Sequence, residues 1–254
     1  ADTIAAEDTR VTRKLLSHYD IHTPLIAYHQ HSAMERSEEI VEILRAGKNV
    51  ALVSDAGTPG ISDPGHELIA LCIAEGVRIE PIPGPTAIIA ALVVSGVSTT
   101  RFAFDGFPPR KEGERTAFFQ SLRRDTRTLC LYESPSRLIK TLTSMLEVLG
   151  NRRVAVVREA TKLFEEVFRG PVSEALERFS EQRVRGEIVI VVEGCTADET
   201  ESAPSEQSVR DRLSELIESG LSERDAVRQC VIEFRLPKRQ VYAEALKLKD
   251  DRER

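Results

Sequence analysis

Residues 54–65, with the sequence SDAGTPGISDPG, combine residue types that suit a ligand-binding loop. Three glycines allow the backbone to approach a ligand closely, and the aspartates, serines and threonine supply short polar groups. The segment matches neither G-x-x-x-x-G-K-S/T nor G-x-G-x-x-G, which disfavours a triphosphate or an ordinary dinucleotide. Because Asp55 and Asp63 are acidic, a ligand with a hydroxyl, an amine or a positive centre fits better than an anion. A loop that only caps the following helix would have the same composition, so this alternative stays open.

Two other turns are candidates to line the same pocket. Residues 81–92 (PIPGPTAIIAAL) predict a strand-to-helix turn of small residues, against which an adenine or a ribose fits. Residues 6–10 (AEDTR) place Glu7, Asp8 and Arg10 just before an amphipathic helix, where they would form a polar pocket wall. Asp8 is also a good N-cap for that helix, and this structural role is sufficient to explain it.

Other reaction chemistries find little support. His29 and His31 have a spacing seen in metal sites, but such a site needs a third ligand, so we expect no metal. The four cysteines are far apart and lack C-x-x-C spacing, which argues against disulfides and structural zinc. The sequence has no G-x-S-x-G motif and no cysteine in a triad-like setting, so hydrolase chemistry is not supported.

Apolar runs that alternate with amphipathic stretches predict an α/β fold that carries these loops. In the first half we expect a helix over 34–46 and strands over 25–28, 49–54 and 77–83. The next helix is expected to have Asp63 as N-cap and Pro64 as its first residue, and to end before Gly76. The uncharged helix after Pro85 should be buried on most faces.

A change of composition at residues 102–110 predicts a linker between two α/β domains, 1–102 and 103–195. In the second domain we expect helices over 116–124 and 135–149, and strands over 128–132, 153–158 and 187–193. Polar residues 196–208 predict a further linker. A helical appendix over 209–254 should follow, with helices at 209–219, 222–234 and 238–249.

Length and composition are those of an ordinary globular protein. With 254 residues, 41% of them hydrophobic, the chain is long enough for one large or two small domains. No apolar run approaches the roughly 18 residues of a membrane span, and no signal-like segment opens the sequence, so we expect a cytoplasmic protein. The net charge of -6 argues against indiscriminate nucleic-acid binding, although basic residues outnumber acidic ones over 101–140.

Several motifs occur together in an order that resembles one family. They are AEDTR, ALVSDAGTPGISDPG, PIPGPTAIIAAL, YESPSRL, REATK followed by two glutamates, and GEIVIVVEG. Over about residues 1–194 the sequence resembles the tetrapyrrole methylase superfamily, and the first two motifs resemble its branch that methylates ribosomal RNA. The family pattern has a strand and a GTPIGN-like loop ahead of the part matched from Ala1 onward. It also has His where this sequence has Ser136, and Leu where it has Ala160.

The resemblance implies a cofactor cleft between the two domains and S-adenosylmethionine as the methyl donor. It also implies a homodimer that methylates the 2'-oxygen of a cytidine ribose in 16S ribosomal RNA of the small subunit. Carried over residue by residue, the implied cofactor-binding positions are Asp55, Gly57, Thr58, Ile61, Ser62, Thr86, Ala87, Tyr132 and Glu133.

In such a reaction the ribose 2'-oxygen attacks the methyl group in line, and holding the two groups in contact supplies most of the acceleration. A carboxylate that accepts the hydroxyl proton would add roughly 10²-fold or more. Asp8 is the first candidate for this base and Glu7 the second, with Arg10 or Lys162 orienting a phosphate. Alternatively, proximity alone suffices and Asp8 only caps its helix.

Basic residues are the expected RNA contacts, because they attract phosphates. The candidates are Arg110, Lys111, Arg115, Arg123, Arg124 and Arg127, with Lys238, Arg239, Lys247 and Lys249 in the C-terminal helices. Exposed basic side chains are more often ordinary solvated surface. Two other functions stay open: a methylase of small tetrapyrroles from the same superfamily, and a non-catalytic RNA-binding protein.

Overall fold

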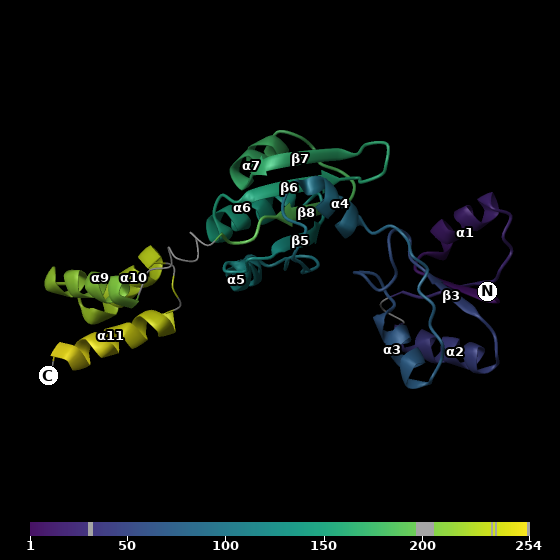
Figure 1. Ribbon diagram of the computed structural model, residues 1–254, viewed down its shortest axis with the longest axis horizontal. Helices are drawn as coiled ribbons and strands as arrows, with labels where there is room; N and C mark the ends of the chain where they lie inside the picture. The colour runs from purple at the N-terminus through teal and green to yellow at the C-terminus, as the bar shows by residue number, and fades with distance from the viewer. Residues whose placement is uncertain (30–32, 197–205, 235, 237, 253–254) are drawn as a thin grey trace. The chain divides into compact units, whose positions relative to one another are not determined.

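The described part of the chain forms two compact units in a computed structural model (Figure 1). The structure describes residues 1–29, 33–196, 206–234, 236 and 238–252. Unit 1 comprises Ala1–Arg123 and Arg127–Glu193, and unit 2 comprises Arg124–Thr126 and Gly194–Arg254. Unit 1 contains two sheets, which confirms the predicted α/β fold.

The first sheet of unit 1 is parallel and has three strands in the order β2-β1-β3. Its elements in chain order are β1 (Thr3–Ala6), α1 (Thr9–His18), β2 (Leu25–Ala27), α2 (Ala33–Arg45), β3 (Val50–Val53) and α3 (His66–Ala74). The core around Ala5, Tyr28 and Ile40 is buried between this sheet and its helices. Since Ala6 and Val53 are paired at the carboxyl ends of β1 and β3, the segments that follow them leave from one edge.

The second sheet has five strands in the order β4-β5-β8-β6-β7. Its elements in chain order are α4 (Ala87–Ser95), β4 (Phe102–Phe104), α5 (Glu112–Leu122), β5 (Thr128–Glu133), α6 (Leu138–Leu149), β6 (Arg153–Arg158), β7 (Glu166–Pro171), α7 (Val172–Ser180) and β8 (Ile188–Val192). Only β4 and β5 pair in parallel, and the other pairs are antiparallel.

Helices cover both faces of the second sheet. Alternate residues of its strands point to opposite faces. Leu129 and Leu131 therefore pack in a cluster with α5, α6 and α7, whereas Cys130 packs with α4. Because both faces are buried, the central strands are continuous apolar runs, as the sequence of β8 shows.

The helices of unit 2 are α9 (Glu206–Glu218), α10 (Glu223–Phe234) and α11 (Lys238–Arg252), which confirms the predicted helical appendix. A separate apolar core holds it together and includes Leu213, Ala226 and Cys230. Helix α9 begins inside the stretch predicted as a linker, and residues 197–205 of that stretch lie outside the described residues.

Three local predictions are wrong in the first half of the chain. Helix α3 begins at His66 with Gly65 as N-cap, because the backbone at 62–65 is still coiled and Asp63 cannot cap it. Residues 77–83 pair with no described strand, since Pro81 and Pro83 lack the N–H groups that a ladder needs. Helix α4 is not buried on most faces: Val93 is 70% exposed.

The second half contains elements that the sequence did not predict. Strand β4 falls within the segment predicted as a linker, and β7 was missed because an edge strand with charges, Gly170 and Pro171 lacks an apolar run. Helix α7 was missed although Val172, Ala175 and Phe179 follow helical spacing. Helix α5 starts four residues earlier than predicted, at Glu112, and α6 starts three later, at Leu138.

A buried carboxylate fixes the end of β5 against α6. The side chain of Glu133 is fully buried and pairs with Arg137, whose Nε lies 2.8 Å from Oε1. Glu133 also accepts hydrogen bonds from the hydroxyl of Thr141 and from the backbone N–H of Ser134. Each oxygen therefore has partners that compensate for the loss of water.

We expect Glu133→Ala to lower the free energy of unfolding by about 3 kcal/mol, because it leaves buried donors and the Arg137 charge without their acceptor. Urea unfolding followed by circular dichroism measures this loss. Glu177→Ala is the matched control, since Glu177 is exposed on α7, and it should change stability by less than about 0.5 kcal/mol. Equal effects of the two substitutions would contradict the structural role of Glu133.

Candidate functional site

Two strand ends of the first sheet are tied together by their acidic residues. The backbone N–H of Asp8, after β1, donates to Oδ1 of Asp55 at 3.3 Å. In return the backbone N–H of Asp55, after β3, donates to Oε2 of Glu7 at 3.4 Å. The structure thus brings together the AEDTR turn and the 54–65 loop, which the sequence predicted as parts of one pocket.

The 54–65 loop coils through several left-handed backbone positions. Gly57, Gly60 and Ser62 have φ values of 78°, 83° and 63°, and only glycine adopts such values without cost. Gly65 has φ 157°, and a Cβ atom there would lie 3.1 Å from the backbone nitrogen of Gly60. This close approach turns the chain back on itself and holds Asp63 near the strand ends.

Asp63 is half-buried and carries a carboxyl group with an unusual pKa. Burial and the nearby charge of Glu7 raise its pKa to about 6, although a hydrogen bond with Ser54 opposes the change. Asp55 and Glu187 add smaller repulsions. The sequence predicted Asp63 both as an acidic group of the ligand-binding loop and as a helix N-cap, but it gave no sign that the Asp63 carboxyl group lies near Glu7.

The surroundings of Asp8 lower the pKa of its carboxyl group, in contrast to those of Asp63. Its side chain caps α1 by accepting from the backbone N–H of Arg10 at 2.8 Å, and it forms an ion pair with the Arg10 guanidinium. The hydrogen bonds from the Arg10 side chain and backbone lower the pKa of Asp8 to about 2. Asp8 therefore remains ionised across the physiological range and is a weak proton acceptor.

A second wall comes from the start of α4 and the end of β5. The Thr58 hydroxyl donates to the carbonyl of Pro85 at 3.3 Å, which joins the 54–65 loop to the 81–92 turn. The phenol of Tyr132 hydrogen-bonds with Thr86 and accepts the backbone N–H of Ile88 in the first turn of α4. Burial is the main cause that raises the pKa of Tyr132, and the charges of Asp63 and Glu187 contribute.

Aromatic packing fixes the orientation of Tyr132. Its ring lies 4.9 Å from the ring of Phe104 and 5.5 Å from that of Phe107, measured between centroids. Ala87, also predicted to bind the cofactor, is the first residue of α4, while Ile61 is 40% exposed in the loop. The carboxylate of Glu133 is occupied by its buried partners, so only its backbone is available to a ligand.

The predicted RNA-binding residues differ in accessibility. Arg115 is only 6% exposed, and its guanidinium donates to Ser144 and to the carbonyl of Arg110, so its prediction as an RNA contact is wrong. Lys162 lies between the carboxylates of Glu159 and Glu187. The exposed candidates are Arg110, Lys111, Arg123 and Arg124.

Basic residues of unit 2 add few described contacts. Lys247 pairs with Glu244 at 2.7 Å. The side chains of Lys238, Arg239 and Lys249 lie outside the described residues.

Neither a metal centre nor a membrane span emerges from the described residues. His31 lies outside them, so the predicted His29–His31 pair is not described as a whole. In the described parts of the chain no three His, Cys, Asp or Glu side chains are grouped to hold a metal ion. No helix there is long and apolar enough to cross a membrane.

Solved structures of other proteins share the fold of this chain. Cobalt precorrin-4 methyltransferase aligns with a TM-score of 0.56 and 21% identity, over 76% of this chain and 84% of that one. Uroporphyrin-III C-methyltransferase from Thermus thermophilus, solved with S-adenosyl homocysteine, aligns with a TM-score of 0.52 and 19% identity, over 76% and 85%. The protein thus has the fold of this class of methyltransferases.

Sequence comparison places the chain within a family. The family model of Tetrapyrrole (Corrin/Porphyrin) Methylases matches residues 1–176. A relative from Synechocystis sp., named Ribosomal RNA small subunit methyltransferase I, is 47% identical over 98% of this chain and 90% of its own length. A Bacillus subtilis relative of the same name is 41% identical over 95% of this chain and 84% of its own length. The chain belongs to the tetrapyrrole methylase family.

The environment of Asp63 is open to direct measurement. In a carboxyl-carbon NMR titration we expect Asp63 to titrate near pH 6 and Asp8 near pH 2. Glu7→Gln should lower the pKa of Asp63, because it removes a like charge, but burial should keep the value above 3.8. Glu38→Gln, an exposed change on α2, should leave it unaltered. An Asp63 that titrates near 4 in the unmodified protein would contradict this description of the loop.

Proposed function

We propose that this chain is an S-adenosylmethionine-dependent methyltransferase that acts on ribosomal RNA of the small subunit. The similarity to relatives of that name carries the proposal, since it extends over 98% of this chain for one of them. It includes the loop and the turn whose acidic residues are joined by hydrogen bonds. The finer part of the proposal is that the methyl group goes to the 2'-oxygen of a cytidine in 16S RNA, as the motifs imply.

The residues of the loop fit the proposed cofactor. S-adenosylmethionine has a positively charged sulfonium, and the charges of Glu7 and Asp55 lie close enough to raise the pKa of the Asp63 carboxyl group. Addition of a Cβ at Gly57 would meet no atom within 4 Å, so there is open space beside this backbone. The remaining proposed contacts are Thr58, Ile61, Ser62, Thr86, Ala87, Tyr132 and Glu133. When bound, the cofactor supplies an electrophilic methyl group.

We assign the proton-accepting role to Asp63 rather than to Asp8. A general base works best when its pKa lies near the operating pH, because it is then ionised and still accepts a proton well. The value of about 6 for Asp63 meets this condition, whereas the value of about 2 for Asp8 does not. Asp8 then caps α1 and holds the Arg10 guanidinium, while Glu7 helps to keep the pKa of Asp63 raised.

Exposed basic residues supply the proposed RNA contacts. Arg110, Lys111 and Arg123 are exposed in unit 1, and Arg124 is exposed in unit 2. Lys111 also lies 3.0 Å from Glu114, an exposed ion pair that RNA phosphates can replace at little cost. Lys162 and Arg10 are each held by carboxylates, which fixes their ammonium and guanidinium groups for an orienting role.

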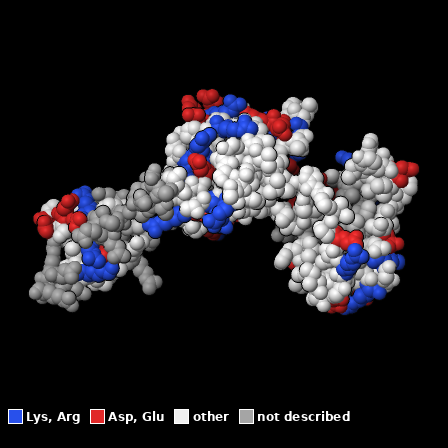
Figure 2. Space-filling view, in the orientation of Figure 1, with Lys and Arg blue, Asp and Glu red and all other residues white. Residues whose placement is uncertain are grey.

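A homodimer and a cytoplasmic location complete the proposal. Helix α4 has no charged residue, and it exposes Ile89, Val93 and Val94. Figure 2 shows the charged side chains of unit 1 in separate clusters with broad uncharged areas between them. An exposed apolar helix face supports association with a second copy. A ribosomal substrate supports the cytoplasm as the place of action.

The substrate is tested by incubating the chain with S-adenosylmethionine and 16S RNA, naked or in the small subunit. We expect 2'-O-methylcytidine by nucleoside mass spectrometry, and saturable cofactor binding by calorimetry. Methylation of a base, or of a nucleoside other than cytidine, would overturn the proposal that the methyl group goes to the 2'-oxygen of a cytidine. Methylation of uroporphyrinogen instead of RNA would favour a tetrapyrrole methylase. RNA binding without cofactor binding would favour a non-catalytic protein.

The proton-accepting role of Asp63 is tested by Asp63→Asn, which keeps the shape of the side chain but removes its proton acceptor. We expect a loss in kcat/KM of at least about 100-fold, the usual contribution of a general base. In the unmodified enzyme kcat/KM should rise with pH and level off above about 6, because Asp63 loses its proton there. Asp8→Asn should retain this pH profile. A normal rate and profile for Asp63→Asn would remove the assignment.

A further inference from the structure

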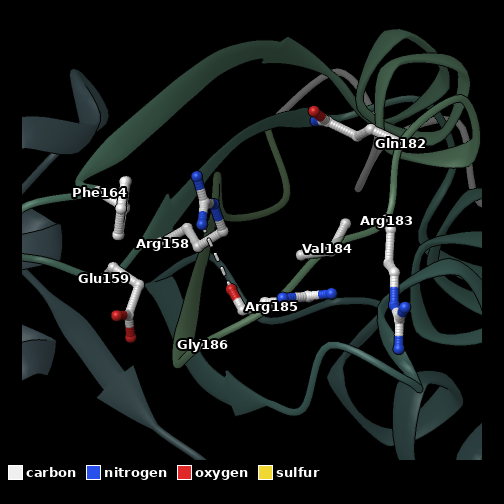
Figure 3. Close-up of a pocket in the computed structure, with 8 residues that line it drawn as sticks. All are labelled: Arg158, Glu159, Phe164, Gln182, Arg183, Val184, Arg185 and Gly186. Carbon is white, nitrogen blue, oxygen red and sulfur yellow. Dashed lines mark hydrogen bonds between the residues drawn. The ribbon is translucent and has the colours of Figure 1, made fainter.

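A pocket of about 290 Å³ lies beyond the carboxyl end of β6 and the amino end of β8. None of its lining residues belongs to the loops described above. Figure 3 shows its lining, which comes from the end of β6, the 159–165 segment and the 181–187 segment. This volume is near the lower limit for small-molecule sites, which span roughly 300–1,000 Å³. It has room for one nucleobase, which leaves the attached phosphate at the opening.

The walls of this pocket are held in place by internal contacts. Arg158 donates to Glu166 at 3.1 Å and to the carbonyl of Arg185 at 3.4 Å. Glu159 accepts the backbone N–H of Glu187 at 2.9 Å. Gly186 has φ 89°, and a Cβ atom on it would lie 2.4 Å from the Glu159 side chain. Only glycine therefore fits against Glu159 here without moving it.

The charges in these walls are largely balanced, except for two arginines at the opening. Arg158 is neutralised by Glu166, and Glu159 is neutralised by Lys162. The side chains of Arg183 and Arg185 are exposed, and among the described residues no ion pair is recorded for either guanidinium. The pocket consequently offers positive charge to a ligand, and phosphate is one of the groups that arginine binds through paired hydrogen bonds.

An exposed aromatic ring completes the lining. Phe164 is 67% exposed, and Figure 3 shows it across the pocket from Arg183. Its neighbour Leu163 is 90% exposed. An aromatic side chain beside unpaired cations is the combination that binds unpaired nucleotides, because the base stacks on the ring while the cations hold the phosphate.

The sheet register places this pocket close to the candidate active site. Glu133 pairs with Ile188, and Ile188 pairs with Arg158, so the pocket and the end of β5 share one edge of the sheet. Neighbouring strands are about 4.8 Å apart, which puts β6 roughly 10 Å from β5. A nucleotide held in the pocket is thus a neighbour of the nucleotide presented to the methyl donor.

We propose that this pocket binds a single unpaired nucleotide of the RNA, next to the one that is methylated. Arg183 and Arg185 hold its phosphate, and Phe164 stacks on its base. The proposal rests on the proposed function and specifies how the RNA strand is held beside the active site.

The test measures binding of a fluorescent single-stranded RNA oligonucleotide, with the 16S sequence around the methylated cytidine, to the full chain. We expect Arg183→Ala with Arg185→Ala to weaken binding at least tenfold. The slope of log affinity against log salt should fall by about 0.7, since one neutralised phosphate contributes about that amount for single strands. Arg153→Ala is the matched control, because Arg153 is exposed at the other end of β6. This substitution should leave the RNA affinity and its salt dependence unchanged.

Stacking is tested separately with Phe164. Phe164→Ala should weaken RNA binding roughly 5- to 150-fold, the range for loss of one stacked base, and Phe164→Trp should restore it. The KM for RNA should rise in these variants, while kcat and the affinity for S-adenosylmethionine stay within about twofold.

Three outcomes would overturn the pocket proposal. Unaltered RNA affinity in the variants, with methyl transfer intact, would refute the pocket and leave the proposed function standing. Loss of cofactor binding in the same variants would assign the pocket to the cofactor instead. Failure of the unmodified protein to bind or methylate RNA would remove the proposed function and the pocket together.

Discussion

Burial of both faces of the five-stranded sheet is the constraint on which the rest of unit 1 depends. Its central strands have apolar side chains above and below, packed against α4 on one face and α5, α6 and α7 on the other. Polar groups have no place along such strands. They gather at the strand ends instead, where Tyr132, Arg158 and Glu187 lie, so this sheet offers its polar groups at an edge.

Charged side chains are arranged in two different ways at this edge and in the adjoining loops. Around Arg158 and Lys162, acidic and basic groups pair and fix the backbone. Around Asp63 there is an excess of carboxylates, and partial burial raises the pKa of one of them. The first arrangement gives rigidity, and the second leaves a group able to exchange a proton. Methyl transfer depends on fixed geometry, and the proposed transfer to a hydroxyl group also needs an acceptor for the hydroxyl proton.

The sequence predicted those features that depend on local patterns. The run that forms β8 was readable because a buried central strand is continuously apolar, and the half-buried β3 is likewise an uninterrupted apolar run. The absence of a strand at 77–83 depends on proline and on the lack of a partner, and the second cause is not local. The pairing of Glu7 with the Asp55 backbone spans 48 residues, so only the tertiary structure shows it. The likeness to a known family, by contrast, predicts directly which loops bind the cofactor.

A carboxyl group with a pKa of about 6 also makes ligand binding and proton release interdependent. A positively charged ligand beside Asp63 favours the ionised carboxylate. In those molecules in which Asp63 is protonated, binding of the ligand therefore releases the proton. Below the pKa this release opposes binding, and the apparent affinity falls as the solution becomes more acidic. A single coiled turn of the backbone at 62–65 thereby gives the protein a thermodynamic link between its charge and the binding of a cationic ligand.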